Sequence, residues 1–248
     1  MGHVEDCNAL AIEVDRFAVV MASLPLDREI ASCPGWNVRD LAEHLGVIHR
    51  WAEELVRLRA PERIAREVTD ELSAAVSPQW IEAGGRQLVA TLLAADPDDA
   101  MWGWGRDQHV RFWSRRQLHE TLVHRMDLEL AAEITPAAEG EIVGDAIDEF
   151  LSNMETIATR DPSLSKLRGN GERLGFRVRD SAVRWTINFS NDGFSVSKDD
   201  ASLTTELIGS PVDLLLVILG RREVEQSDAD VVGDPGLLDS WLSHSEFG

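Results

Sequence analysis

The sequence predicts a protein of two domains, a helical bundle over residues 1–160 and a small α+β domain over residues 170–248. In the first part, apolar residues recur at spacings of three and four, which is the pattern of amphipathic helices. In the second part, apolar and polar residues alternate one by one, which is the pattern of half-buried strands. The stretch between them, residues 159–171, is rich in proline, glycine and serine, and we interpret it as the linker.

The helices of the first domain are predicted from their apolar stripes and from the turns between them. The clearest stripe contains Leu41, Leu45 and Ile48, and Asn37 is a suitable N-cap just before it. The preceding "CPGW" at residues 33–36 has the composition of a turn. Together these signals predict helices over residues 5–23, 38–59, 78–95, 107–132 and 139–159.

The second domain is expected to contain a mostly antiparallel sheet. The segments "LGFRVRD", "AVRWTINFS" and "FSVSKD" alternate apolar and polar residues, and "RDSA" and "SNDG" supply turns between them. Another strand is predicted in "ASLTTELIG". The helix that follows begins with Ser210 as a suitable N-cap and Pro211 as its first residue. A last strand and the short helix "DPGLLDSWL" complete the domain.

Composition excludes several classes of partner. The 248 residues include 44 acidic and 24 basic side chains, so a net charge of −20 argues against binding to nucleic acid or an anionic membrane. No stretch approaches the roughly 18 apolar residues of a membrane span, and the first residues lack the features of a secretory signal. Cys7 and Cys33 form no disulfide framework, and we expect both thiols to be buried or inert. We expect a cytoplasmic protein, monomeric or homodimeric.

The stretch "RRQLHETLVHRMDLEL" at residues 115–130 carries most of the chemistry. It comes close to H-E-x-x-H, the zinc-protease signature, in which two histidines four positions apart share one helix face. Here His119 and His124 are five positions apart and point about 140° away from each other on a helix. They cannot hold one metal ion together, so the protease interpretation fails.

Glu120 and His124, by contrast, are one helical turn apart on the same face, and Asp127 extends that row. A carboxylate and an imidazole in this arrangement can both reach one ion, as zinc and similar metals require. A third ligand must come from another helix. His44 borders the apolar stripe of the helix over residues 38–59 and is the best candidate, whereas His49 projects elsewhere.

The residues alone leave a simpler interpretation open. A glutamate and a histidine one turn apart are common on solvated helix faces, and His44 by itself fits a hydrogen-bonded histidine near a core. His3, His109 and His244 receive no functional interpretation. Three tryptophans lie near the proposed site in sequence and are candidates for excluding water from it: Trp36, Trp51 and Trp113.

Two segments, "CPGWNVRDLAEHLGVIHRWAEEL" and "FWSRRQLHETLVHRMDLELA", resemble the hallmark segments of the mycothiol-dependent maleylpyruvate isomerase family. The N-terminal domain of that family is a DinB-like, metal-binding four-helix bundle. The segment "LIGSPVDLLLVILGRREVEQSDADVVGDPGLLDSWL" is similar to the family's small C-terminal domain, which itself resembles sterol carrier proteins. The resemblance covers nearly the whole chain.

The resemblance implies a site and its cofactors. The family's metal triad falls on His44, Glu120 and His124, which implies Zn²⁺ or another divalent transition metal, with mycothiol as the thiol cosubstrate. The family's Gly-Arg pair falls on Gly220 and Arg221, and that arginine is expected to meet an acidic group of thiol or substrate. A surface arginine at a helix end is the simpler alternative for Arg221.

Two neighbours of the triad are assigned supporting roles from their positions on the helix. Asp127, close to one turn beyond His124, is expected to orient an imidazole N–H. Arg116, one turn before Glu120, is expected to pair with it, although a solvated salt bridge is the simpler interpretation.

The expected function is that of a metal-dependent thiol enzyme, in which a zinc-activated mycothiol thiolate attacks an electrophilic small molecule, as in a mycothiol S-transferase. Three alternatives stay open. The first is a maleylpyruvate cis–trans isomerase that uses mycothiol as cofactor. The second is a non-catalytic metal- or ligand-binding protein. The third is a metal-dependent hydrolase, for which Asp127 is the one base that can be named.

Overall fold

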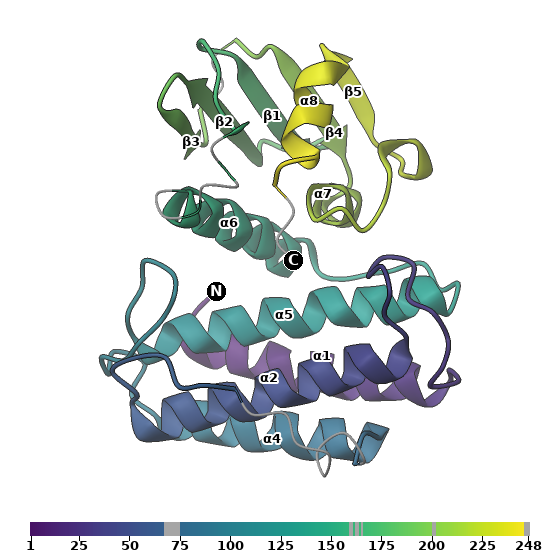
Figure 1. Ribbon diagram of the computed structural model, residues 1–248, viewed down its shortest axis with the longest axis vertical. Helices are drawn as coiled ribbons and strands as arrows, with labels where there is room; N and C mark the ends of the chain where they lie inside the picture. The colour runs from purple at the N-terminus through teal and green to yellow at the C-terminus, as the bar shows by residue number, and fades with distance from the viewer. Residues whose placement is uncertain (67–74, 159–160, 162–163, 165, 200–201, 246–248) are drawn as a thin grey trace. The chain divides into compact units, whose positions relative to one another are not determined.

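The computed structural model describes residues 1–248 apart from 67–74, 159–160, 162–163, 165, 200–201 and 246–248 (Figure 1). The chain divides into two compact units, Met1–Ala137 and Ala138–Gly248. The first unit is helical and the second contains a five-stranded sheet. The predicted fold class, a helical bundle followed by a mostly antiparallel α+β domain, is therefore confirmed.

The division between the units differs from the predicted one. The sequence placed it near residue 160, whereas the structure places it before α6 (Gly140–Ile157). The physical reason is packing, because α6 contacts α7 (Pro211–Ile218) and β3 (Gly193–Ser197). An amphipathic pattern predicts that α6 is a helix but not which unit covers its apolar face. Part of the predicted linker, 159–171, lies outside the described residues.

The helical unit is a four-helix bundle in the described residues. Its helices are α1 (His3–Ala22), α2 (Val38–Leu58), α4 (Pro78–Ala94) and α5 (Val110–Ala131). α1 packs against α4 and α5, and α2 packs against the same two helices (Figure 1). The predicted stripes face inward, and Leu10, Phe17 and Leu45 are among the largest buried side chains. The predicted cap of α2 forms as a capping box between Asn37 and Asp40.

A buried group of charges joins α1 to α5. The guanidinium of Arg125 is fully buried and donates to the carboxylates of Glu13 on α1 and Glu129 on α5. It also donates to the carbonyl of Ala137, 3.2 Å away. Removing one member of such a group leaves an uncompensated buried charge, which costs about 3–5 kcal/mol. The registry of α1 on α5 is thus held by charge as well as by apolar contact.

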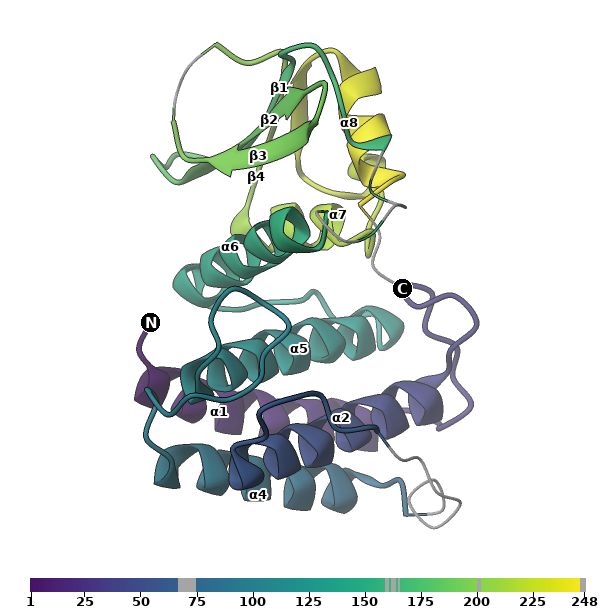
Figure 2. The ribbon, with the colours of Figure 1, turned by 60° about the vertical axis from the view of Figure 1, so that its left-hand side comes forward.

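The second unit combines one sheet with three α-helices in its described residues. The strand order is β3–β2–β1–β4–β5, and every neighbouring pair is antiparallel except β1 with β4. The helices α6 and α7 lie side by side (Figure 2). The other elements are β1 (Arg173–Val178), β2 (Arg184–Ser190), β4 (Thr205–Gly209), β5 (Asp230–Gly233), a 3₁₀ turn (Val224–Gln226) and α8 (Pro235–Leu242).

Ring packing and hydrogen bonds hold the helices of this unit to its sheet. Trp241 of α8 packs edge-on against Phe194 of β3, with ring centroids 5.2 Å apart. The indole N–H of Trp185 on β2 donates to Asp148 of α6 over 2.6 Å. Among the residues that the structure describes, no helix combines the length and apolar character that crossing a bilayer requires.

His49 gives the helical unit a measurable dependence on pH. Its side chain is fully buried between α2 and α5, with Nε2 2.9 Å from the hydroxyl of Thr121 and no partner for Nδ1 in the described part of the chain. Burial, the largest cause, lowers the pKa of His49 from 6.5 to about 3. Between pH 6.5 and about 3, His49 therefore binds a proton in the unfolded chain but stays neutral in the folded chain.

We expect the free energy of unfolding to be highest above about pH 6.5 and to fall as the pH drops towards 3. Between pH 7.5 and 5.0, wild type should lose about 2 kcal/mol more stability than His49→Gln, which has no imidazole to protonate. Urea unfolding followed by circular dichroism at both pH values measures this difference. His244→Gln, which removes an imidazole from the other unit, is the control. Equal losses in wild type and His49→Gln would contradict the prediction.

Candidate metal centre

Helices α2 and α5 bring together the three residues that the sequence selected. Oε1 of Glu120 lies 3.1 Å from Nε2 of His44 and 3.4 Å from Nε2 of His124. One ligand atom from each of the three side chains lies within 4.8 Å of the other two. Glu120 and His124 come from successive turns of α5, and His44 comes from the neighbouring α2. The arrangement follows from packing the apolar stripe of α2 against α5.

The chemistry and spacing of these donors fit a metal ion. A tetrahedral zinc ion holds its ligands at about 2.0–2.1 Å, which places the ligand atoms roughly 3.3 Å apart. The observed separations of 3.1 and 3.4 Å are close to that spacing. Two imidazoles and one carboxylate form the donor set of catalytic zinc sites, which keep a further position open. The exposed fractions of the side chains rise from 9% for His124 to 19% for Glu120 and 28% for His44, so the site opens on the side of His44.

The Glu120 carboxylate is kept ionised by its neighbours. Burial alone raises the pKa of Glu120, but the guanidinium of Arg116 and the hydrogen bonds with His124 and His44 outweigh it. The pKa of Glu120 is therefore well below its usual value. Arg116 lies one turn earlier on α5 and forms an ion pair with this carboxylate, as the sequence indicated. An ionised carboxylate that could bind a metal is thus present at neutral pH.

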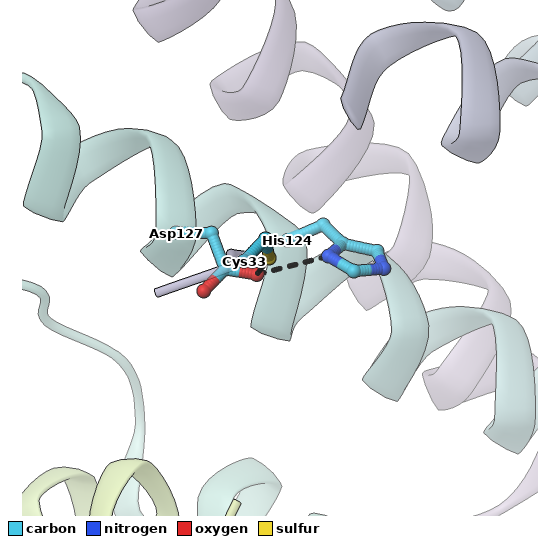
Figure 3. Close-up of side chains that lie close together, drawn as sticks. All are labelled: Cys33, His124 and Asp127. Carbon is cyan, nitrogen blue, oxygen red and sulfur yellow. Dashed lines mark hydrogen bonds and ion pairs between the residues drawn. The ribbon is translucent and has the colours of Figure 1, made fainter. Parts of the chain in front are cut away.

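The Asp127 carboxylate forms a hydrogen bond with Nδ1 of His124, the ring nitrogen that does not face Glu120 (Figure 3). Nδ1 of His124 lies 2.9 Å from Oδ2 of Asp127, whose side chain is completely buried. Burial lowers the pKa of His124, but hydrogen bonds with Asp127, Cys33 and Glu120 outweigh burial and raise it well above its usual value. The contact agrees with the expected orientation of an imidazole N–H by Asp127, whose role in metal binding stays a prediction.

Ser32 and Cys33 are two contributors that the sequence did not reveal. The hydroxyl of Ser32 donates to Oδ1 of Asp127 over 2.6 Å, and the thiol of Cys33 donates to Oδ2 over 3.4 Å. Cys33 is buried as predicted, but it lies beside the candidate metal centre. The one signal in the sequence is their position just before the "PGW" turn, which does not show that this loop packs on α5.

A second group of possible ligands overlaps the first. Cys33, His124 and Asp127 also offer three atoms within 4.8 Å of one another. The two groups use opposite nitrogens of the His124 ring, since Nδ1 faces Asp127 and Nε2 faces Glu120. All three members of the second group are buried, whereas His44 and Glu120 are partly exposed. A centre that must admit a ligand is better served by the group with His44.

A cavity of about 610 Å³ lies beside His44 within the helical unit. The indole of Trp36 packs against the ring of His44, with centroids 5.0 Å apart. The lining residues are Gly35, Trp36, Asp40, Glu43, His44, Val47 and Arg66. The cavity offers room for a small molecule next to the most exposed of the three candidate ligands.

Other residues considered from the sequence lie away from this cavity. His119 is buried on the other stripe of α5, as predicted. Trp51 and Trp113 pack against each other with centroids 5.3 Å apart, so of the three tryptophans only Trp36 lines the cavity. The pKa of Cys7 is raised to about 12, chiefly by burial, which makes that thiol inert.

Arg221 belongs to the second unit and follows the end of α7. Gly220 adopts a φ of 65°, which ends the helix, and the backbone N–H of Arg221 donates to the carbonyl of Leu216 over 2.7 Å. The next residue, Arg222, pairs with Asp213 over 2.6 Å. The role suggested for Arg221 in binding an acidic group stays a prediction.

Comparison with known proteins supports the fold and the family of this chain. Residues 7–129 match the family model described as the mycothiol maleylpyruvate isomerase N-terminal domain. Two crystal structures of the mycothiol-dependent maleylpyruvate isomerase, one of them a histidine-to-alanine mutant, each share 12% identity with the chain. Both comparisons cover 93% of each chain, with TM-scores of 0.57 and 0.56 for the wild type and the mutant. At this identity the structures show a shared fold.

Weaker comparisons add nothing to the assignment. A UbiJ-SCP2 ubiquinone synthesis protein shares 19% identity over 42% of this chain and 94% of its own. Its TM-score of 0.32 carries no conclusion about the second unit. No curated protein matches the sequence. Through its helical unit, the chain belongs to the mycothiol-dependent maleylpyruvate isomerase family.

Proposed function

We propose that this protein is a mycothiol-dependent enzyme whose metal centre, formed by His44, Glu120 and His124, activates the thiol for attack on an electrophilic carbon. The observation that carries the proposal is the meeting of three donor atoms from two helices beside an open cavity. Membership of the family supports mycothiol as the thiol. The donor set favours zinc or a similar divalent ion.

A bound divalent ion supplies positive charge that lowers the pKa of a thiol, which is about 8.5 when free. The protein side chains prepare this step. Arg116 keeps Glu120 ionised, so that the carboxylate is ready to serve as a ligand. Asp127 accepts from Nδ1 of His124, which leaves Nε2 of that ring for the ion. Trp36 packs against one side of His44.

The cavity favours transfer of the thiol to an uncharged electrophile. Its wall carries two carboxylates, Asp40 and Glu43, against one guanidinium, Arg66. Such a wall repels a substrate with two carboxylates more than a neutral one. In the transfer, a carbon–sulfur bond forms and the electron pair displaced from the attacked double bond takes up a proton from solvent. This charge pattern supports the S-transferase interpretation.

The family supports cis–trans isomerisation as the second candidate. In that reaction, the same sulfur adds to a conjugated cis double bond, rotation follows about the resulting single bond, and elimination returns the thiol. We propose that Arg221 of the second unit binds an acidic group of thiol or substrate in either reaction. A hydrolase is less well supported, because Asp127 is fully buried and already accepts from Ser32 and His124.

Removing ligands should remove the metal. We expect Glu120→Ala and His124→Ala to lose stoichiometric zinc, since each leaves only two of the three donors. Metal analysis after dialysis against excess zinc and then zinc-free buffer measures this, with folding checked by circular dichroism. His109→Ala, which changes the N-cap residue of α5 and lies outside the site, should retain zinc. Folded variants that still bind one zinc ion would refute the assignment of ligands.

The thiol reaction should depend on the same ion. Chelation should abolish the reaction of mycothiol with an activated alkene, and added zinc should restore it. Mycothiol turnover that persists in metal-free protein would exclude the proposed activation. Protein that binds zinc but accelerates no thiol reaction would favour the non-catalytic alternative.

The charge of the cavity wall should set the preference between electrophiles. N-ethylmaleimide and maleate share a cis double bond, but only maleate carries two negative charges. Relative to the uncatalysed rates, we expect kcat/KM to favour the neutral compound. Replacing Asp40 and Glu43 by Asn and Gln should shift that preference towards maleate by roughly three- to tenfold, because the two charges together contribute on the order of 1 kcal/mol at about 8 Å in a water-like dielectric.

The control for this comparison is Asp15→Asn, which removes an exposed acidic group of α1 that does not line the cavity. It should leave the preference unchanged. A wild-type enzyme that turns over maleate as efficiently as the maleimide, and loses that ability in Arg221→Gln, would favour the isomerase instead.

A further inference from the structure

The loop between α1 and α2 carries two buried hydrogen-bond donors that both point at Asp127. We propose that Ser32 and Cys33 are positioning residues of the metal centre, which hold the Asp127 carboxylate and thereby fix the ring of His124. The inference rests on the proposed role of His124 as a metal ligand. It gives a function to two residues of a loop that comes from the opposite end of the unit's sequence.

The first step concerns the Asp127 carboxylate. Its side chain is completely buried, and a buried charge is stable only when donors surround it. Ser32 donates to Oδ1 over 2.6 Å, and Cys33 donates to Oδ2 over 3.4 Å. The two donors engage different oxygens, so rotation of the carboxylate breaks at least one bond. Figure 3 shows Cys33 and His124 converging on Asp127.

The second step concerns the His124 ring. Oδ2 of Asp127 can only accept a hydrogen bond, so Nδ1 of His124, 2.9 Å away, must carry a proton. Metal binding requires the neutral imidazole, which has one N–H, and in that form Nε2 presents its lone pair. That atom faces Oε1 of Glu120 at 3.4 Å, on the side of the proposed ion. A carboxylate held in one orientation thus selects the tautomer that can bind metal.

The third step concerns the loop itself. Three backbone hydrogen bonds close it: Ile30 N–H to Trp36 C=O at 2.9 Å, Cys33 N–H to Ile30 C=O at 2.9 Å, and Trp36 N–H to Cys33 C=O at 3.0 Å. Gly35 adopts a φ of 83°, a conformation that other residues rarely take. The same turn presses Trp36 against His44. One rigid loop therefore supports both histidines of the centre.

The two donors should differ in importance. A hydroxyl is a stronger donor than a thiol, and the bond from Ser32 is the shorter one. We expect Ser32→Ala to weaken zinc binding by roughly 10- to 100-fold, in the range typical for groups that orient a metal ligand. Cys33→Ala should weaken it less, and Cys33→Ser, which keeps a donor, should restore binding to near the wild-type value.

Two measurements separate positioning from a merely structural role. The first is the dissociation constant for zinc by competition with a chelator. The second is the nitrogen-15 spectrum of His124 in metal-free protein at a pH high enough to leave the ring neutral, which reports whether Nδ1 or Nε2 carries the remaining proton. We expect wild type and Cys33→Ser to hold the Nδ1–H form, and Ser32→Ala to show a mixture. Cys7→Ala, which removes the other buried cysteine, is the matched control and should change neither result.

Cobalt distinguishes a second possibility for Cys33. If its sulfur were a metal ligand, the cobalt-substituted protein would show a sulfur-to-cobalt charge-transfer band that disappears in Cys33→Ser. We expect no such band, and its presence would overturn the positioning role of Cys33. Zinc affinities of Ser32→Ala and Cys33→Ala that equal that of Cys7→Ala, in folded proteins, would overturn the proposal as a whole.

Failure of the proposed function and failure of this inference give different results. Wild-type protein that binds no zinc would refute the metal enzyme. The nitrogen-15 comparison in metal-free protein would still decide whether Ser32 and Cys33 fix the His124 tautomer.

Discussion

The ionised carboxylate of Glu120 is the group on which the candidate centre depends. It is only 19% exposed, and a charge in such a place is costly unless partners compensate it. Arg116 supplies the compensating charge from one turn earlier on the same helix, while His44 and His124 supply polar contacts from two helices. One oxygen of this carboxylate thus contacts both imidazoles. Every other feature of the centre either holds these three side chains or gives a ligand access to them.

Helix α5 is the element that makes this arrangement stable. It carries Glu120 and His124 on one face and the buried Arg125 on another. Arg125 pairs with Glu13 of α1, so the helix that carries two candidate ligands is also held by charge on another face. The loop after α1 then returns to α5 and places Ser32 against Asp127. The position of the loop follows from the registry of α1 on α5.

Helical geometry allowed much of the centre to be predicted. The spacing of Glu120 and His124 gives one face of one helix, and the border of an apolar stripe selects His44 from another. The bundle and the alternating strands followed from the same kind of pattern. The parallel pairing of β1 with β4 was not visible, because alternation indicates a strand and not its neighbour.

Contacts between distant segments were beyond the reach of such patterns. Ser32 and Cys33 lie more than ninety residues from Asp127, and no local spacing links them to it. The same reason explains α6, whose amphipathic pattern is clear but whose partners are α7 and β3 of the following unit. Residues that meet along one helix can be paired from sequence, whereas residues that meet through packing need the structure.

Four acidic side chains around this centre illustrate how surroundings decide the chemistry of one functional group. Asp127 is fully buried and surrounded by donors, so it is suited to orient His124. Glu120 is compensated by Arg116 but faces two imidazoles, and it is therefore suited to bind a cation. Asp40 and Glu43 line the cavity beside His44. In the proposed enzyme, the same functional group thus serves as a support, as a ligand or as a determinant of substrate charge, according to its burial and its partners.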